Sequence, residues 1–285
     1  MKKTKIICSI GPATNTKEVF KELAHAGMNV ARVNFSHATL EERQTVRDLV
    51  SWINEEENLN IGLLYDTKGP EFRSGEAVEE GIELIAGNTI RVVKETVIGN
   101  QERFSVNHPE ALDSLSVGSV IQLENGLMKI EVISKENDGV TCKVINGGVL
   151  KSRKSLFVPG VKLDIPFISE VDKEDIIYAC NNNGDFLALS FVSTKEDVLE
   201  ARKIIEHENS KMKVIAKIES KTGIDNLDEI LEVSDGVMVA RGDLGEEVPI
   251  SLLPVYQKLI VRKAREHGKF CIVATEMLES MKKNS

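Results

Sequence analysis

Charged side chains lie near or just after the C-terminal ends of two strand-like runs in the second half of the chain, where a parallel sheet places its ligands. The runs cover residues 213–219 and 236–241, and both are rich in β-branched and apolar residues. Lys217 and Glu219 are two positions apart, so on a strand their side chains point to the same face. Asp243 follows the second run in Arg-Gly-Asp-Leu-Gly, whose glycines permit a tight turn. A lysine and two carboxylates are therefore expected at one mouth.

Such a group of side chains has two interpretations. Two carboxylates with room for water suit a hard divalent cation such as Mg²⁺, and a lysine beside them could neutralise a phosphoryl group or a developing enolate. The alternative is an ordinary buried ion pair of Lys217 with Glu219 or Asp243, because many barrels carry charge at strand ends without any chemistry. These residues alone leave both interpretations equally open.

The second strand-like run of the chain ends in Arg-Val-Asn-Phe-Ser-His and adds polar groups. Arg32 and Asn34 share a face, so a guanidinium and an amide oxygen reach the mouth that holds Lys217. The alternative is a salt-bridged arginine followed by residues that cap the next helix. For Ser36 and His37 taken alone, the capping interpretation is preferred.

The third run ends in Asp-Thr-Lys-Gly-Pro. Asp66 and Thr67 supply oxygen atoms there, and with Asn34 and Ser36 they form a set that could hold a monovalent cation. Arg73, a few residues later, could reach a phosphate group. The alternative is a hinge with turn chemistry and an exposed charge pair. Neither a Walker loop nor a GxGxxG motif is present, so a nucleotide would bind without them.

Alternating strand and helix patterns must position these residues, and they predict an α/β fold, a (β/α)8 TIM barrel with about seven strands. Between residues 73 and 157 the pattern changes to short strands separated by turn signals, which predicts an inserted small all-β domain. The barrel domain then comprises residues 1–72 and 158–285. It lacks strand eight and the last helices, and an open sheet edge would remain.

Two local expectations accompany this fold. The segment between the runs 213–219 and 236–241 is predicted to be one amphipathic helix, with Leu227, Ile230, Leu231 and Val233 on its apolar side. Thr275 ends the last strand, where it is by itself more often a helix cap, and another helix is expected over residues 276–283.

Composition limits the function classes. The 36 basic and 45 acidic residues give a formal net charge of −9, which argues against a nucleic-acid or anionic-membrane surface. No apolar stretch is long enough to span a bilayer. The four cysteines have no CxxC spacing, so neither a zinc site nor a disulfide framework is indicated, and a reducing cytoplasm fits best. Cys8 and Cys271 lie in apolar strand patterns and are expected to be buried.

Taken together, these residues closely resemble the pyruvate kinase family. The matching stretches run in order over the whole chain: KIICSIGPAT, MNVARVNFSH, YDTKGPEFRSGE, PGVKLDIPFISEVDKED, LALSFV, VIAKIES, DGVMVARGDLG and VATEMLESM. The resemblance implies a phosphotransferase of glycolysis that moves the phosphoryl group of phosphoenolpyruvate to ADP, giving pyruvate and ATP, with Mg²⁺ or Mn²⁺ and usually K⁺. It also implies that the inserted all-β domain is a lid.

The resemblance implies a role for each matching residue. Glu219 and Asp243 would hold the divalent ion, and Asn34, Ser36, Asp66 and Thr67 would hold K⁺. Lys217, Arg32 and Thr275 are the catalytic candidates, with Lys217 stabilising charge on the phosphoryl group and the enolate. Substrate contacts would come from Arg32, Ser190, Lys217, Gly242, Asp243 and Thr275, and nucleotide contacts from Asn34, His37, Arg73 and Lys154.

The sequence departs from the family pattern at several positions. Ser193 replaces a usual arginine, Ser220 a usual asparagine and Glu276 a usual glutamine, while Ser155 and Phe157 interrupt a familiar run beside the lysine assigned to the nucleotide. The eighth strand and the C-terminal domain of the family are expected to have no counterpart in these 285 residues. The sequence therefore predicts the N-terminal part of a pyruvate kinase that is a cytoplasmic homotetramer at full length.

Two other functions remain open. One is a short pseudoenzyme or regulatory fragment that binds without turnover. The missing eighth strand favours it, and the retained Lys217, Glu219, Asp243 and Thr275 disfavour it. The other is a metal-dependent pyruvate lyase or aldolase on a related barrel. The lid with Arg73 and the motif from Arg32 to His37 count against it, because a carbon–carbon lyase needs no second phosphate site.

Overall fold

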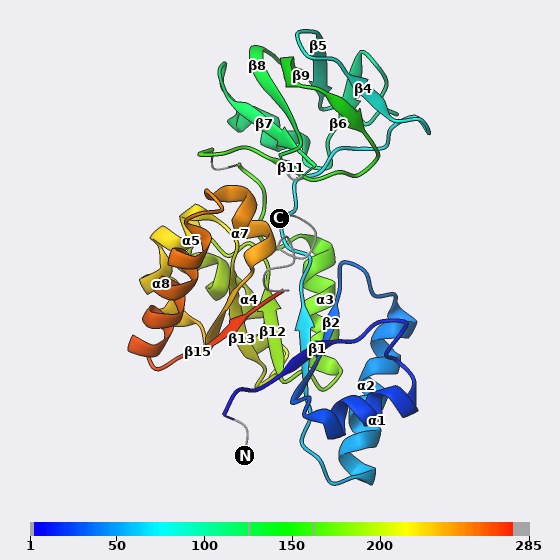
Figure 1. The fold of residues 1–285 in the computed structure, drawn as a ribbon, viewed down its shortest axis with the longest axis vertical. Coiled ribbons are helices and arrows are strands. Elements are labelled where there is room, and N and C mark those ends of the chain that lie inside the picture. The colour runs from blue at the N-terminus through cyan, green and yellow to red at the C-terminus, as the bar shows by residue number, and fades with distance from the viewer. Residues whose placement is uncertain (1–2, 125, 162, 276–285) are drawn as a thin grey trace. The chain divides into compact units, whose positions relative to one another are not determined.

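The computed structural model describes residues 3–124, 126–161 and 163–275, and the chain divides into two units. The larger unit comprises Met1–Gly69 and Phe167–Ser285, and the smaller one Pro70–Pro166. The elements of the larger unit are β1 (Ile7–Ser9), α1 (Lys17–Ala26), β2 (Val30–Asn34), α2 (Leu40–Glu56), β3 (Gly62–Asp66), α3 (Glu170–Asn181), β12 (Phe186–Leu189), α4 (Lys195–His207), β13 (Lys213–Ile218), α5 (Lys221–Asp225), α6 (Leu227–Val233), β14 (Gly236–Val239), α7 (Arg241–Glu247), α8 (Leu253–Glu266) and β15 (Phe270–Val273) (Figure 1).

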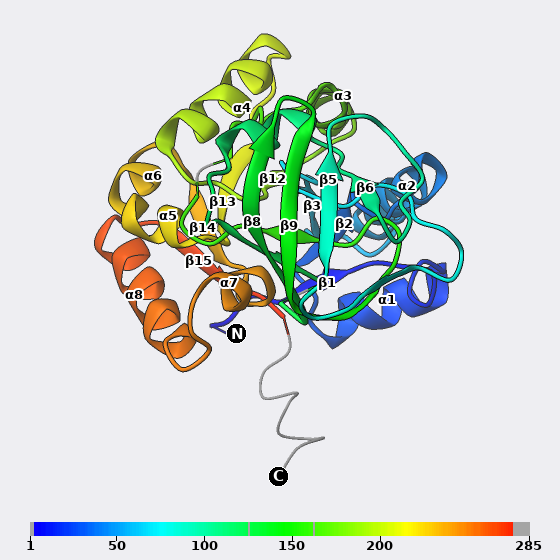
Figure 2. The ribbon, with the colours of Figure 1, turned by 90° about the horizontal axis from the view of Figure 1, so that it is seen from above.

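The strands of the larger unit form one curled parallel sheet. Within the described part of the chain it has seven strands, in the order β1-β2-β3-β12-β13-β14-β15. Figure 2 shows helices of this unit around the outside of these strands. The expected incomplete α/β barrel of about seven strands is therefore confirmed. No helix of the described residues is both long and apolar enough to cross a membrane.

Local sequence signals start and stop the helices that surround the sheet. Thr39 caps α2 and forms a capping box with Glu42, and Ser169 forms the same arrangement with Asp172 at the start of α3. Gly27 ends α1 with φ 113°, a left-handed conformation that glycine adopts without a Cβ penalty. These caps fix where each helix meets its strand, and so where each strand delivers its last residues.

The sheet separates two apolar layers, and β13 shows how. Val214 and Ala216 belong to the large cluster that includes residues of the surrounding helices, whereas Ile215 belongs to a small cluster on the other face with Leu64 and Met238. Successive side chains of a strand alternate between its faces. The residues that follow Ile215 at two-residue steps therefore face the inside of the barrel as well.

The structure differs from the expectations at two places near the central strands. The expected single helix after β13 is broken into α5 and α6, because Asn226 caps both and its side chain donates to the Ser193 carbonyl. The segment expected as a tight glycine turn after β14 is helix α7, which carries Asp243 in its first turn. A carboxylate is favourable there because the first turn exposes unpaired N–H groups.

The expected burial of two thiols was also wrong. Cys8 and Cys271 are only half-buried, because β1 and β15 are the edge strands of the sheet in the part of the chain described. All four residues of the neighbouring β14 are buried, while Phe270 on β15 is 42% exposed. An apolar strand pattern alone does not tell a central strand from an edge strand. The helix expected over residues 276–283 lies outside the described residues.

The smaller unit is built from short strands. They are β4 (Ile82–Leu84), β5 (Thr89–Val93), β6 (Arg103–Ser105), β7 (Val120–Leu123), β8 (Met128–Glu136), β9 (Gly139–Asn146), β10 (Gly148–Leu150) and β11 (Leu156–Phe157), with the 3-10 helix η1 (Pro109–Ser114) between β6 and β7. Its described strands form a six-stranded sheet in the order β11-β7-β8-β9-β5-β6 and a two-stranded sheet of β10 and β4. The unit has its own apolar core. The expected all-β insertion is confirmed.

Cys142 should report on the folding of this smaller unit. Its side chain is 0% exposed on β9, and burial raises the pKa of its thiol to about 12. Because the thiolate is the nucleophile, we expect iodoacetamide at pH 8 to alkylate native Cys142 roughly 10³-fold more slowly than an unperturbed cysteine. Mass spectrometry with and without denaturing urea measures the rate. Equal rates in the two conditions would contradict the buried position.

Candidate active site

A cavity of about 890 Å³ opens inside the parallel sheet of the larger unit. Its lining combines apolar residues of the barrel interior with a polar end made of Arg32, Lys217, Glu219, Asp243 and Thr275. Lys217, Glu219, Asp243 and Thr275 lie at or just beyond the carboxyl ends of their strands, and Arg32 lies two residues before the end of β2. This is the end where barrels of this class carry their active sites.

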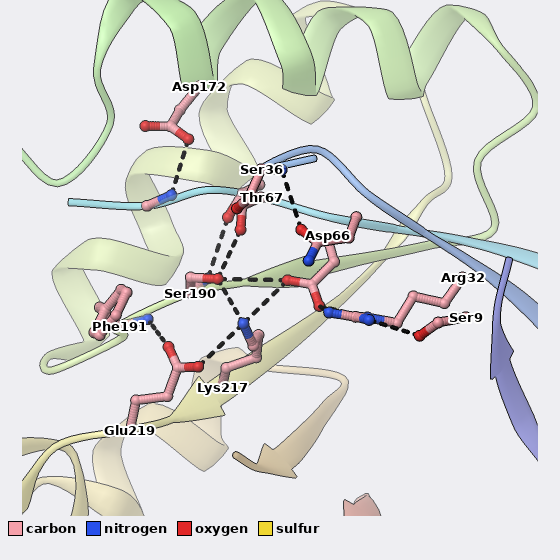
Figure 3. A network of polar contacts seen from close by, with 12 residues as sticks. Ser9, Arg32, Ser36, Asp66, Thr67, Asp172, Ser190, Phe191, Lys217 and Glu219 are labelled. Carbon is pink, nitrogen blue, oxygen red and sulfur yellow. Dashed lines mark hydrogen bonds and ion pairs between the residues drawn. The ribbon is translucent and has the colours of Figure 1, made fainter. Parts of the chain in front are cut away.

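Lys217 lies at the centre of a polar network at this end of the sheet (Figure 3). Its Nζ donates to Ser190 Oγ at 2.7 Å and lies 3.1 Å from Asp66 Oδ1 and 3.0 Å from Glu219 Oε1. Burial acts to lower the pKa of the ammonium, but the Glu219 and Asp66 carboxylates outweigh it, so the pKa is raised. The lysine is therefore a permanent positive charge, and its side chain is only 11% exposed.

Glu219 has one oxygen fixed by the backbone and one facing its charged neighbour. Oε2 accepts from the backbone N–H of Phe191 at 2.5 Å, and Phe191 has φ 58°, a left-handed conformation that is strained for a residue with a side chain. Oε1 has the ion-pair contact with Lys217 but accepts no hydrogen bond from the described residues. Burial raises the pKa of Glu219 to about 7, with Lys217 opposing the shift and Asp243 adding to it.

Asp66 connects Lys217 to a second cation. Its Oδ2 accepts from Arg32 Nε at 2.7 Å and lies 2.6 Å from Nη2, while Nη1 of the same guanidinium donates to Ser9 Oγ at 2.6 Å. The side chain of Asp66 is fully buried. A buried carboxylate needs such partners, because an unpaired charge is costly to remove from water. The result is a chain of alternating charges from Arg32 through Asp66 and Lys217 to Glu219.

Three residues of this network were not singled out from the sequence. Ser9 orients the Arg32 guanidinium, Phe191 donates its backbone N–H to Glu219, and Asp172 accepts from the backbone N–H of Gly69 at 3.0 Å. Ser9 lies at the end of β1, so the rule that found the other strand-end residues could have found it. No residue type signals the other two, since one acts through its backbone and the other caps a helix.

The remaining candidates of the larger unit lie at other points of its strand ends. Asn34 Oδ1 accepts from the backbone N–H of Ser36 at 3.1 Å, and His37 is exposed in the same turn. Gly242 is exposed on α7. Thr275 lines the cavity with φ 67°, another left-handed residue.

The departures from the family pattern form local contacts. Ser193 Oγ lies 3.3 Å from Ser220 Oγ, and Ser220 also caps α5 through the N–H of Gly223. The two hydroxyls therefore pair where larger side chains were expected. Glu276 lies outside the described residues.

Two nucleotide candidates belong to the smaller unit, where carboxylates hold both. Arg73 donates from Nε and Nη2 to the two oxygens of Glu71 at 2.7 and 3.0 Å, and Lys154 pairs with Glu124 at 2.7 Å. A bidentate pair of this kind fixes the plane of a guanidinium. A phosphate at Arg73 would therefore compete with Glu71.

The donor set at the cavity fits a hard divalent cation. Glu219 Oε1 is a buried carboxylate oxygen that accepts no hydrogen bond from the described residues, and Asp243 is a second carboxylate on the same cavity. No cluster of three or more His, Cys, Asp or Glu side chains that could hold a metal occurs in residues 3–124, 126–161 and 163–275. Mg²⁺ is commonly bound by one or two carboxylates, with water and substrate oxygens completing its shell.

Comparison with known proteins gives one family. Residues 1–285 match the family described as "Pyruvate kinase, barrel domain". The chain is 44% identical over 286 residues to the pyruvate kinase of Staphylococcus epidermidis (strain RP62A) and 43% identical over 287 residues to that of Staphylococcus haemolyticus (strain JCSC1435). All of this chain is covered in both cases, and it spans 49% of the length of each relative.

A solved structure agrees with these relatives. The crystal structure of a pyruvate kinase from Cryptosporidium parvum superposes with a TM-score of 0.90 and 39% sequence identity, covering 98% of this chain and 58% of that one. The family match includes every strand of the parallel sheet and the whole all-β insertion. The chain therefore belongs to the pyruvate kinase family.

Proposed function

We propose that the protein transfers the phosphoryl group of phosphoenolpyruvate to ADP, giving ATP and pyruvate. The observation that carries this proposal is the Lys217 ammonium, which is held by Asp66, Ser190 and Glu219 at the polar end of the cavity. A fixed cation in a site of low water content stabilises developing negative charge at no further cost of reorganisation.

The chemistry explains why such a cation is needed. The bond between phosphorus and the enol oxygen breaks, and a bond forms between phosphorus and an oxygen of the terminal ADP phosphate. Negative charge is spread over the transferring group, and the departing oxygen becomes that of an enolate. Lys217 faces both charges, and Arg32, held by Asp66 and Ser9, supplies a second cation for the phosphate.

The remaining steps concern the carbon end of the substrate. The enolate takes a proton at carbon to become pyruvate, and Thr275 is the proposed residue near the path of that proton. The backbone around Gly242 and the Thr275 hydroxyl would receive the substrate carboxylate, with Ser190 nearby. Asp243 and Thr275 both line the cavity, which supports this assignment.

Two cations complete the proposal. Mg²⁺ or Mn²⁺ held by Glu219 and Asp243 would polarise the phosphoryl and enolate oxygens. K⁺ would be held by oxygens of Asn34, Ser36, Asp66 and Thr67. Both carboxylate oxygens of Asp66 already contact cationic side chains, so a bound K⁺ would have to share them.

The nucleotide would be held by Arg73, Lys154, Asn34 and His37, and closure of the all-β lid would exclude water that could hydrolyse the phosphoryl donor. We further propose a reducing cytoplasm as the location, in keeping with four free cysteines, and a homotetramer for the whole protein.

A coupled assay tests the function. The purified protein is mixed with phosphoenolpyruvate, ADP, MgCl₂ and KCl, and pyruvate is measured through NADH oxidation by lactate dehydrogenase. We expect turnover that requires ADP and the divalent cation. Calorimetric binding of phosphoenolpyruvate without turnover would instead indicate a non-catalytic binding protein. Pyruvate released from a 4-hydroxy-2-oxo acid, without phosphoenolpyruvate, would indicate a lyase.

A further inference from the structure

Ser190 has no hydroxyl hydrogen to spare for a substrate in this structure. Its Oγ accepts from Lys217 Nζ at 2.7 Å, and it donates to the Thr67 carbonyl oxygen at 2.7 Å, while Asp66 Oδ1 is more distant at 3.4 Å (Figure 3). A lysine ammonium can only donate, so the single hydroxyl hydrogen must point to an acceptor, and Thr67 is the nearest. The buried hydroxyl is oriented by its neighbours on both sides.

The same serine holds the segment that leads out of β3. Its backbone N–H donates to Thr67 Oγ1 at 3.1 Å, and the N–H of Thr67 donates to the Ala188 carbonyl at 2.9 Å. With the hydroxyl contact, three hydrogen bonds join Thr67 to the end of β12. They continue the β3–β12 pairing past the last strand residues.

Gly69 brings the backbone of this segment close to Ser190. It has φ 72°, and a Cβ added there would lie 2.8 Å from Ser190 Cβ and 3.0 Å from its carbonyl oxygen. The backbone of Gly69 therefore comes closer to Ser190 than any residue with a side chain could. Asp172 keeps it there, because its Oδ1 accepts from the Gly69 N–H at 3.0 Å.

Asp172 is well suited to this task because it is itself fixed. It is 3% exposed at the start of α3, and its Oδ2 accepts from Ser169 Oγ at 2.6 Å in the capping box. One carboxylate oxygen thus holds the helix terminus and the other holds Gly69. The contacts run without interruption from α3 through Gly69 and Ser190 to the ammonium of Lys217.

We propose that Asp172 is a positioning residue for Lys217, acting through Gly69 and Ser190. This inference rests on the proposed function, because it assigns Asp172 to the placement of the cation that stabilises the transferred phosphoryl group. Asp172 touches neither the cavity nor the reacting atoms. It fixes the position of the segment after β3. That segment, through the Thr67 carbonyl, orients the Ser190 hydroxyl, whose oxygen accepts from Lys217.

The matched pair of variants is Asp172→Ala and Ser169→Ala. Each removes the bond between Ser169 Oγ and Asp172 Oδ2 and one further bond of the α3 capping box, and only the first removes the bond to Gly69. A general weakening of α3 therefore affects both, whereas a loss of positioning affects one. Asp172→Asn keeps an oxygen acceptor of the same size and should restore wild-type behaviour. Gly69→Ala perturbs the same contact independently, by driving a methyl group into Ser190.

The first readout needs no enzymatic activity. Trace labelling with acetic anhydride, followed by peptide mass spectrometry, measures acetylation of Lys217 relative to the exposed Lys211. We expect this ratio to be roughly threefold to tenfold higher in Asp172→Ala than in Ser169→Ala, because Nζ becomes more accessible to the reagent. A change of this size corresponds to the loss of about one hydrogen bond. Gly69→Ala should change it in the same direction. Equal ratios in the matched pair, or no rescue by Asp172→Asn, would overturn the proposal.

Steady-state kinetics supply the second readout and separate the two proposals. With an active wild type, Asp172→Ala should lower kcat while leaving KM for phosphoenolpyruvate within about twofold, since a displaced Lys217 weakens the transition state more than the bound substrate. A proportional loss in Ser169→Ala would contradict positioning. If the wild type shows no turnover while the labelling ratios differ as expected, the proposed function fails and the role of Asp172 in placing Lys217 stands.

Discussion

Replacement of Lys217 by methionine is expected to lower kcat for phosphoryl transfer by roughly three orders of magnitude or more. Methionine keeps most of the length of the side chain and removes its charge. In the proposed function the ammonium faces the charge that develops on the phosphoryl group and the enolate, so its loss should raise the barrier more than it weakens substrate binding. The coupled assay measures kcat, and calorimetric titration with Mn²⁺ should show that the variant still binds the divalent cation.

Lys221→Met is the matched control for this substitution. Lys221 lies four residues further on, is exposed on α5 and pairs with Asp225 in the larger unit. It should keep kcat within about twofold of wild type, because exposed ion pairs contribute little. Turnover of Lys217→Met close to that of Lys221→Met would exclude the role assigned to Lys217.

The alternation of β13 explains why so much of this site was predictable. A strand with one face toward the helices and one toward the barrel interior places Ile215, Lys217 and Glu219 on the same side. A charged side chain on the inner face of such a strand needs an oppositely charged or hydrogen-bonding partner, since an unpaired buried charge is costly. Spacing alone was therefore enough to bring Lys217 and Glu219 together, and parallel pairing of β13 with β14 brings Asp243 to the same cavity.

The contacts that hold these site residues in place could not be predicted from the spacing of residues in the sequence. Glu219 is held by the backbone of Phe191, whose left-handed conformation is set by tertiary contacts and not by its residue type. Asp172 forms a local capping box with Ser169, but only the fold brings Gly69 to its second oxygen. Contacts between segments about a hundred residues apart have no local signal.

The edges of the sheet show a further limit of pattern reading. The runs that form β14 and β15 look alike, yet β14 is fully buried and β15 is not. Burial of a strand depends on having neighbours on both sides, and within the described residues β15 has one neighbour, β14. The exposure of Phe270 is therefore a property of strand order, which no single run of residues contains.

Replacement of Glu219 by glutamine is expected to weaken Mn²⁺ binding by about 100-fold or more, since even supporting residues of metal sites contribute up to that factor. Glutamine preserves the size of the side chain and removes the charge that a hard cation requires. Electron paramagnetic resonance of free Mn²⁺ measures the affinity without any need for turnover. Asp225→Asn, which neutralises an exposed carboxylate on α5, should leave the affinity unchanged.

The pH dependence of this binding gives the sharper test. Burial raises the pKa of Glu219 to about 7, so the carboxylate is charged above pH 7 and takes up a proton below it. Proton and metal compete for the same oxygens, and Mn²⁺ affinity in the wild type should fall by roughly tenfold per unit as the pH drops below 7. Glu219→Gln cannot take up that proton and should show a flatter profile. Parallel profiles in the two proteins would mean that Glu219 does not hold the ion, and that its buried Oε1 only balances the charge of Lys217.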